Sequence, residues 1–386
     1  MKYFLETGYS SLNKKGEELC GDNVEEKRDD DSVTLVLADG LGSGVKANIL
    51  STLTSKILCT LISNKVDIDE CIDTIIQTLP VCKVRKVAYS TFSALYVNTD
   101  GEGYLFEFDN PQAILMHNGE AVDMPRKPRI IQGKTVYVSK LQLGDTDAVL
   151  VMSDGVIHAG IGELFNFGWV RSDVKDYLDR NYFPGITARD LAWLLANVCN
   201  DLYDGKPGDD TTIACLRVRK PLKVRIMVGP PIDPKNDETC VLRFLTGEGK
   251  KVVCGGTSSQ LVARYLHQPV QTSLDFSDPD VPPMGYIKGI DLTTEGVLTL
   301  RKLLTLSDKY LSPHDLSPKR QKKTDGASQL CNLLFEEASD ITFFVGQNIN
   351  VAHQGLPIDT TMKLKLVENI ASNLRKAGKH VEINYD

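Results

Sequence analysis

The sequence predicts a mixed α/β protein with two domains. In the first half, short apolar runs that suit strands alternate with turns rich in glycine and aspartate, and three stretches have helical spacing. In the second half, strands and helices follow one another in turn, which is the pattern of an α/β domain. The basic, proline-containing junction Arg219-Lys220-Pro221 lies between the halves. A chain of 386 residues is long enough for two domains, which we expect at residues 1–219 and 220–386.

The composition is that of a globular protein, with 42% hydrophobic and 25% charged residues. A net charge of -7 and a pI of about 5.5 argue against a nucleic-acid partner. We find no apolar run of the roughly 18–20 residues that a membrane span needs, so no membrane partner is expected. The segment Met1–Thr7 lacks the apolar core and cleavage site of a signal peptide, and this predicts a cytoplasmic protein.

The nine cysteines are scattered, with no Cys-x-x-Cys pair and no zinc-ligand spacing. We therefore expect reduced, buried thiols without a redox role.

The first elements lead to an acidic turn. A strand is expected over residues 2–9, and the charged run Glu25–Asp31 reads as a solvated hairpin loop. The apolar strand that follows, around Val33–Leu37, ends at Asp39. Apolar residues at helical spacing then predict two packed helices, Val45 to about Ser63 and Asp67 to Leu79.

The rest of the first half adds strands and one clear helix. The amphipathic helix is predicted over Ala188–Leu202, with Thr187 as its N-cap. The predicted strands are Ser93–Val97, Gly103–Phe108, Ala113–Met116, Val136–Leu143, Ala148–Met152 and Ile213–Val218.

Four short acidic turns each lie beside a buried strand, at Asp22, Asp39, Asp154 and Asp209-Asp210. One interpretation is structural, because aspartate before glycine or threonine commonly makes a turn. The other is a metal site, because Mg²⁺ and Mn²⁺ prefer oxygen ligands. If Asp22 and Asp39 share one end of a hairpin, their repulsion would call for a cation. Two such ions about 3.5–4 Å apart can hold a hydroxide and polarise a phosphoryl oxygen.

The order of these turns resembles a known family. Gly-Asp-Asn, Ala-Asp-Gly-Leu-Gly-Ser-Gly, Ser-Asp-Gly and Gly-Asp-Asp-Thr-Thr occur in the order found in metal-dependent protein phosphatases of the 2C type. The resemblance is closer to the bacterial branch typified by stage II sporulation protein E, and it covers about residues 1–218. It implies an α-β-β-α sandwich of two antiparallel sheets with two Mn²⁺ or Mg²⁺ ions at one edge. It also implies hydrolysis of phosphoserine or phosphothreonine by a water that bridges the two ions.

The resemblance implies a role for each motif residue. Asp39 would bridge both metals and position the water, Gly40 would bind one metal through its carbonyl, and Asp154 would bind the other. Asp209 would be the last metal aspartate, and Asp22 would be an early acidic ligand. Two further ligands are less certain, Asp210 and, at a third metal, Asp109.

The sequence departs from the family at several positions. Leu41 stands where eukaryotic relatives carry a histidine proposed as general acid, so the leaving oxygen would take its proton from water. His158 is a candidate substitute, although a histidine on a helix surface is the simpler interpretation. Arg28 lies in the predicted acidic loop and is not assigned to the phosphate. In the resembled branch the helices that follow the Asp-Gly motif can switch metal binding on or off, and in this sequence these helices would be at Val45–Leu79.

The second half resembles no family that we recognise. Its turn Gly255-Gly256-Thr257-Ser258-Ser259 is either an anion-binding cradle or a helix capped by Thr or Ser, and we favour the capped helix. The segment Ser312–Lys323 reads as an exposed basic loop. Strands are predicted at Val224–Val228, Lys251–Cys254, Ile341–Val345 and His380–Asn384, and helices at Gln260–His267, Thr293–Leu311, about Gly326–Ala338 and Thr360–Lys376.

Two functions follow as hypotheses. The first is a metal-dependent serine/threonine phosphoprotein phosphatase of bacterial signalling. Its substrate would be a phosphoprotein, and its C-terminal domain would bind a small anionic ligand or a protein partner. The alternative is a catalytically inactive phosphatase-like sensor or scaffold that is regulated through that C-terminal domain.

Overall fold

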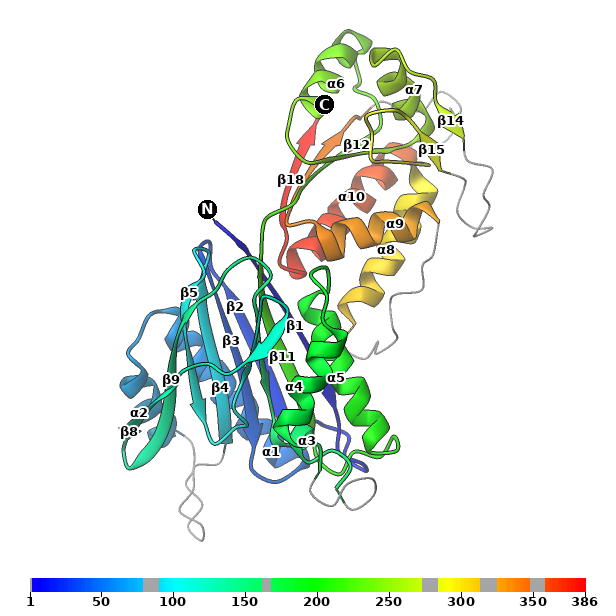
Figure 1. Ribbon diagram of the computed structural model, residues 1–386. Helices are drawn as coiled ribbons and strands as arrows, with labels where there is room; N and C mark the ends of the chain where they lie inside the picture. Colours follow the sequence, from blue (N-terminus) through cyan, green and yellow to red (C-terminus); the bar gives the residue numbers. More distant parts are fainter. Residues whose placement is uncertain (1, 79–89, 162–167, 273–283, 313–324, 348–357) are drawn as a thin grey trace. The chain divides into compact units, whose positions relative to one another are not determined.

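The computed structural model describes residues 2–78, 90–161, 168–272, 284–312, 325–347 and 358–386 (Figure 1). The chain divides into two compact units, Met1–Lys220 and Pro221–Asp386. Each unit is described by itself below.

Two antiparallel sheets form the centre of the first unit. The five-stranded sheet has the order β1 (Phe4–Leu12), β11 (Thr211–Arg219), β10 (Ala148–Met152), β6 (Ile114–His117) and β7 (Glu120–Val122). The six-stranded sheet has the order β2 (Asp22–Arg28), β3 (Ser32–Gly40), β4 (Ser90–Asn98), β5 (Glu102–Phe108), β9 (Lys134–Gln142) and β8 (Lys127–Ile131).

Helices cover the outer faces of both sheets, which gives the predicted α-β-β-α sandwich. The two sheets pack through a shared core that includes Leu35, Leu95 and Leu216. Outside the six-stranded sheet lie α1 (Gly44–Ser63) and α2 (Ile68–Thr78), and outside the five-stranded sheet lie α4 (Arg171–Asn181) and α5 (Ala188–Leu202). Thr187 caps α5 as predicted, because its hydroxyl accepts from the backbone N–H of Asp190.

Strand β3 shows why its sequence is a continuous apolar run. Leu35 and Leu37 face the core between the sheets, while Val36 and Ala38 face the layer of α1 and α2. Both sides of the strand are covered, so both sets of alternating side chains are apolar.

The first half of α1 buries small residues and exposes apolar ones. Ala47 and Ser51 are fully buried, whereas Val45 and Ile49 are 61% and 52% exposed. Close packing against β3 explains the small residues, because a Cβ at Gly40 would overlap the carbonyl oxygen of Ala47.

Helix α1 is also the one helix in the described ranges that is long and apolar enough to cross a membrane, by length and composition only. The expectation that no such segment exists is therefore wrong for Gly44–Ser63. The finding is weak evidence for a membrane, since core helices of soluble proteins pass the same test.

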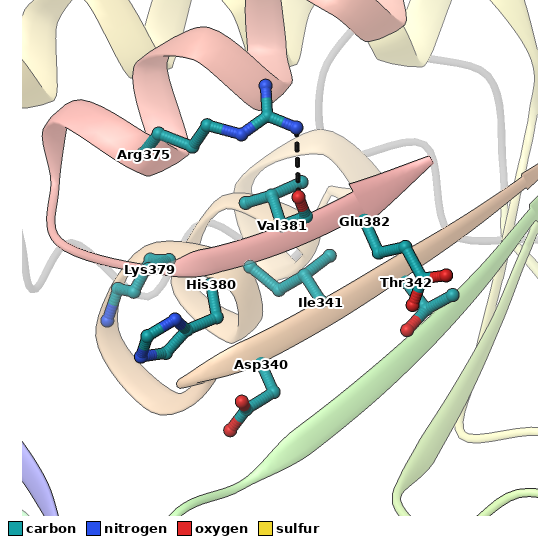
Figure 2. A pocket seen from close by; sticks show the side chains of 8 residues that line it. All are labelled: Asp340, Ile341, Thr342, Arg375, Lys379, His380, Val381 and Glu382. Atoms are coloured by element: carbon teal, nitrogen blue, oxygen red, sulfur yellow. Dashed lines mark hydrogen bonds between the residues drawn. The ribbon is translucent and has the colours of Figure 1, made fainter. Parts of the chain in front are cut away.

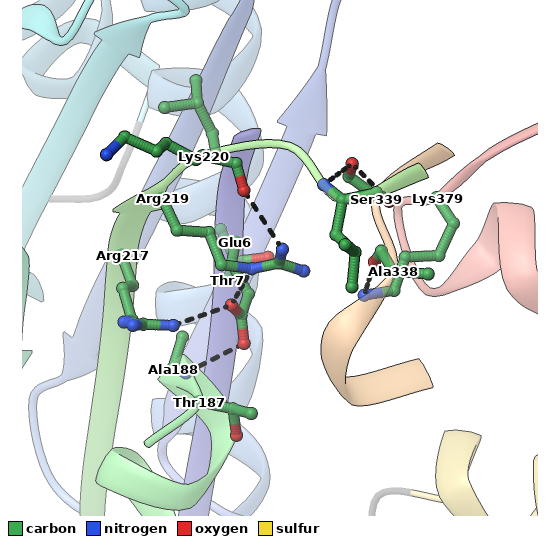
Figure 3. Close-up of polar contacts among 12 residues, drawn as sticks. Glu6, Thr7, Thr187, Ala188, Arg217, Arg219, Lys220, Ala338, Ser339 and Lys379 are labelled. Atoms are coloured by element: carbon green, nitrogen blue, oxygen red, sulfur yellow. Dashed lines mark hydrogen bonds and ion pairs between the residues drawn. The ribbon is translucent and has the colours of Figure 1, made fainter. Parts of the chain in front are cut away.

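A buried ion cluster joins β1, β11 and α5 (Figure 3). Glu6 of β1 is 8% exposed, and its Oε2 lies 2.9 Å from Nε of Arg219 and 3.5 Å from Nη1 of Arg217. Its other oxygen accepts from the backbone N–H of Ala188 at 3.1 Å. Both carboxylate oxygens are thus satisfied, as a buried charge requires.

The second unit is a doubly wound α/β domain. Its parallel strands have the order β16 (Leu292–Thr294), β13 (Lys250–Cys254), β12 (Lys223–Val228), β17 (Asp340–Val345) and β18 (His380–Tyr385). The short strands β14 (Gln271–Thr272) and β15 (Gly285–Tyr286) add an antiparallel edge.

Helices cover both faces of this sheet. One face carries α6 (Asp237–Leu245), which follows the 3-10 turn η1 (Pro234–Asn236), and α7 (Gly256–Tyr265). The other face carries α8 (Val297–Leu311), α9 (Gly326–Cys331), the π-helical turn η2 (Asn332–Glu337) and α10 (Ile358–Lys376).

Several sequence-based boundaries were wrong. Residues 25–28 of the expected hairpin loop belong to β2, because their backbone pairs with β3 from Glu25 opposite Val36 to Arg28 opposite Val33. The helix expected from Thr293 begins at Val297, since Thr293 and Thr294 pair with β13. Helix α4 and strands β7 and β8 were not predicted. The expected basic loop at 312–323 lies, except for Ser312, outside the described residues, as does Cys82; the eight described cysteines are free.

Candidate metal centre

Each sheet of the first unit brings two acidic turns to one end. Asp22 begins β2 and is paired directly with Asp39 near the end of β3. In the other sheet, Asp154 follows β10 and begins the short helix α3 (Asp154–Ile157), and Asp209-Asp210 precedes β11. The backbone N–H of Ser153 donates to Thr212 at 3.0 Å, which places these last two turns side by side.

Two glycines let the turns of the different sheets approach each other. A Cβ at Gly21 would lie 2.7 Å from Oδ2 of Asp210. A Cβ at Gly155 would overlap the backbone carbonyl of Asp210. The residue before Asp22 and the residue after Asp154 are therefore both in contact with the Asp210 segment. At Gly155 the overlap is with backbone, so only glycine permits this approach without movement of the chain, whereas at Gly21 the overlap is with the end of the Asp210 side chain.

The carboxylates repel one another strongly. Burial raises the pKa of Asp39 to about 9, and the charges of Asp22, Asp154, Asp209 and Asp210 add to the rise. Burial also raises the pKa of Asp22 to about 7, against the opposing effect of the Ser153 and Thr212 hydroxyls. The pKa of Asp154 is raised by burial and by Asp209. Asp39 thus feels the charge of all four other aspartates.

Three buried oxygens of this group make no hydrogen bond of normal geometry among the described residues: Oδ1 and Oδ2 of Asp22, which have only the nearby Ser153 and Thr212 hydroxyls, and Oδ2 of Asp210. Buried carboxylate oxygens are normally paired, so these atoms need a cation or another partner. An all-oxygen set of carboxylates fits Mg²⁺ or Mn²⁺ in its chemistry. Within the described ranges, however, no three or more His, Cys, Asp or Glu side chains are close enough to hold a metal ion as they stand. The residues fit a divalent cation in chemical type, and the assignment of individual ligands remains a prediction.

Gly40 has a packing role that the sequence did not indicate. Its N–H donates to the carbonyl of Gly21 at 3.2 Å, and its lack of a Cβ admits Ala47 of α1. The carbonyl ligand role predicted for Gly40 stays a prediction.

Three other residues that the sequence singled out are Asp109, His158 and Leu41. Asp109 is exposed at the end of β5 with a φ of 54°, and its backbone bridges to Phe92, next to the partner of Asp39 in β4. Nδ1 of His158 lies 3.9 Å from Oδ2 of Asp154, at the end of α3. Leu41 is 41% exposed.

Arg28 lies at the opposite end of β2 from Asp22. It donates to the carbonyl of Leu5 and the hydroxyl of Thr7, both at 2.7 Å. It is therefore a strand residue held by β1, and the expectation that it sits in a loop is wrong.

Sequence reasoning missed Lys14 and Glu17, which contact the acidic turns and the loop before α1. Nζ of Lys14 lies 3.4 Å from Oδ1 of Asp209, and Glu17 accepts from the hydroxyl of Ser43 at 2.9 Å. Both lie in a polar stretch between two strands, and nothing in the local sequence distinguishes them from solvated loop residues.

In the second unit, the predicted anion-binding turn has a different cap from the one expected. Gly255, with a φ of 116°, is the N-cap of α7, and no side chain caps this helix. The hydroxyl of Ser258 accepts from the N–H of Gly229 at 2.8 Å, which ties α7 to the end of β12. The preferred interpretation, a helix capped by Thr or Ser, is therefore wrong. Anion binding by Gly255, Gly256, Thr257 and Ser258 stays a prediction.

A hollow in the second unit lies at the start of β17 and β18, lined in part by Asp340, His380 and Glu382 (Figure 2). Arg375 also lines it and donates to the carbonyl of Val381 at 2.9 Å. Ligands of doubly wound sheets bind at the carboxyl ends of the strands. This hollow is at the opposite ends, so its position does not support a ligand site.

The chain is similar to many solved structures, among them the following three. The chain is 21% identical to the PP2C phosphatase domain with a regulatory fragment of SpoIIE from Bacillus subtilis, over 57% of this chain and 63% of that one, with a TM-score of 0.48. It is 18% identical to the RsbU and RsbW domains of a Mycobacterium tuberculosis protein, over 63% and 68% of the chains, with a TM-score of 0.47. The third is RsbX in complex with magnesium, 22% identical over 56% and 96%, with a TM-score of 0.40.

This chain spans less than two thirds of the B. subtilis structure. No curated protein matches it. A family model, stage II sporulation protein E (SpoIIE), matches residues 29–219, which contain Asp39, Asp154 and Asp209. Residues 29–219 of the chain therefore match the SpoIIE family of PP2C-type phosphatases.

Proposed function

We propose that the first unit is a serine/threonine phosphoprotein phosphatase that depends on Mn²⁺ or Mg²⁺ and acts in bacterial cytoplasmic signalling. The observation that carries the proposal is that five aspartates from two sheets lie at one end of the sandwich, and that three of their buried oxygens lack a hydrogen-bond partner among the described residues. A structural turn aspartate needs no such neighbours, and their mutual repulsion costs stability unless a cation balances it.

The chain's own residues would divide the work as follows. The charges of the other four aspartates all act on Asp39, so Asp39 is the residue we propose for the bridging position between two ions. Asp22, Asp154 and Asp209, with the carbonyl of Gly40, would complete the ligand set, and Asp210 and Asp109 are further candidates. When bound, such ions supply a water nucleophile at neutral pH and neutralise charge on the phosphoryl group. The hydroxyls of Ser153 and Thr212 beside Asp22 would favour its ionised form.

One observation favours the second candidate, a catalytically inactive sensor or scaffold. The described carboxylates do not stand close enough together to hold a metal, and Leu41 supplies no proton to a leaving group. For either function we propose that the second unit regulates the first, by binding a small anionic ligand or a partner protein.

Hydrolysis of p-nitrophenyl phosphate and of a phosphoserine peptide tests the proposal. We expect turnover that requires Mn²⁺ and falls by about a hundredfold or more in Asp39→Asn. Substitution of a residue that only hydrogen-bonds to a metal ligand already lowers metal affinity or activity by about 10- to 100-fold, and Asp39 is proposed as a ligand itself. Asp30→Asn, at an exposed turn between β2 and β3, is the matched control and should match the wild type. No metal-dependent turnover in the wild type, or an unchanged Asp39→Asn variant, would favour the inactive sensor.

A further inference from the structure

Lys14 brings a positive charge to the carboxylate group. Its Nζ lies 3.4 Å from Oδ1 of Asp209, and its backbone N–H donates to Oδ1 of Asp210 at 3.0 Å. Lys14 therefore contacts two of the five clustered aspartates, Asp209 and Asp210.

The backbone of Lys14 is fixed while its ammonium group stays accessible. Besides the bond to Asp210, the next residue, Lys15, donates its N–H to the carbonyl of Pro207 at 2.8 Å. The side chain of Lys14 is 36% exposed. A lysine has three donors on a flexible four-carbon stem, so its head group can change partner without movement of the backbone.

A phosphomonoester dianion meets an electrostatic barrier at this centre, because the centre is built from carboxylates. Charged donors that are not themselves ligands can hold the phosphoryl oxygens, and lysine does so as a point charge. Arg28 does not meet this need, since it is bonded to β1 at the far end of β2. His158 lies farther from its carboxylate than Lys14 does, at 3.9 Å against 3.4 Å.

We propose that Lys14 is the side chain that contacts the phosphate of the substrate. With Asp209 acting as ligand to a divalent cation, the Lys14 ammonium would no longer be paired with that carboxylate. It would then donate to the phosphoryl oxygens of a phosphoserine or phosphothreonine. The inference rests on the proposed function and names a substrate contact for the same centre.

Calorimetric titrations of the full chain with Mn²⁺, and of the Mn²⁺-loaded chain with inorganic phosphate, test this role. In Lys14→Gln we expect phosphate affinity to fall by about ten- to a hundredfold, the usual effect of one charge-assisted hydrogen bond. Mn²⁺ affinity should stay equal or become tighter, because a positive charge near the ligands is removed. Lys15→Gln is the matched control, and both of its affinities should equal those of the wild type.

Lys14→Arg keeps the charge and should bind phosphate within a few-fold of the wild-type affinity. This variant tests the proposal even if Lys14→Gln folds poorly. If Lys14→Gln binds phosphate as tightly as the wild type does, and the wild type is an active phosphatase, this inference is overturned while the proposed function stands. A parallel loss of Mn²⁺ affinity would also overturn it, because Lys14 would then support the centre itself. A wild-type chain that binds neither Mn²⁺ nor phosphate would overturn the proposed function together with this inference.

Discussion

Gly155 shows at the scale of one residue how two turns reach the same point. It follows Asp154, and a side chain there would overlap the backbone of Asp210 and approach the Thr211 hydroxyl. Backbone cannot yield as the end of a flexible side chain can, so the fit of the two turns depends on this glycine.

Gly155→Ala should therefore separate the Asp154 turn from the Asp210 segment. We expect a loss of about 1–3 kcal/mol in the free energy of unfolding, the usual cost of overpacking, and weaker Mn²⁺ binding. Gly185→Ala is the control, because a Cβ there meets the Phe183 ring at an ordinary 3.6 Å. Chemical denaturation with and without Mn²⁺ measures both effects. Equal stability of the two variants would show that the close approach is not present.

Glu107 gives a pH-dependent prediction away from the acidic turns. It is 2% exposed in β5, and burial raises its pKa despite the N–H of Ala113, which donates to Oε1 at 2.7 Å, and two arginines. The unfolded chain loses this proton at lower pH than the folded chain does. Folding stability should therefore fall as pH rises above the ordinary glutamate pKa.

Glu107→Gln keeps an acceptor for Ala113 but removes the titration. The stability of the variant relative to the wild type should therefore increase between pH 4 and pH 8. Urea unfolding of both proteins across this range measures the difference, and a difference that is constant with pH would contradict the assignment.

At the scale of elements, α1 has an unusual distribution of side chains. Its N-terminal half buries alanine and serine against β2 and β3, while its C-terminal half buries Leu58 and Ile62. Asn23 of β2 donates to the hydroxyl of Ser55 at 2.6 Å, so polar contacts replace apolar packing where the helix passes the acidic turns.

Substitutions on the two faces of α1 should differ clearly. Leu58→Ala should cost about 2–5 kcal/mol of stability, since the side chain is fully buried. Ile49→Ala should change stability by about 0.5 kcal/mol or less, because Ile49 is half exposed. Thermal unfolding of both variants measures this contrast. A large cost at Ile49 would mean that its face of the helix is covered in solution.

The limits of sequence prediction are visible at the same scale. Helix Ala188–Leu202 was predicted to the residue, because an N-cap and a regular apolar stripe mark it. The strand character of residues 25–28 was hidden, because this strand is stabilised by backbone pairing and its side chains are charged. Likewise, α4 has few apolar residues and could not be recognised from a stripe.

For the candidate site, Asp39, Asp154 and Asp209-Asp210 could be found from the sequence, since each adjoins a buried strand, and Asp22 could be found from its Gly-Asp turn. Their approach depends on which strands pair and on contacts of Gly21 and Gly155 with Asp210. Lys14 reaches Asp209 across 195 residues, and such a contact has no local sequence signal.

At the scale of the whole molecule, the chain consists of a two-sheet sandwich that carries the clustered carboxylates and of a doubly wound unit. The proposed binding of Mn²⁺ would stabilise the first unit, because a ligand held only by the folded state stabilises it. At a free Mn²⁺ concentration of a hundred times Kd the gain would be about 2.7 kcal/mol.

Equilibrium binding of Mn²⁺ to the full chain, followed by calorimetry, tests the central claim most directly. We predict that the wild type binds two Mn²⁺ ions and that Asp39→Asn, which lacks the carboxylate proposed to bridge them, binds neither with comparable affinity. Asp30→Asn should bind as the wild type does. A wild-type chain that binds no Mn²⁺, or an Asp39→Asn variant with unchanged binding, would contradict the account.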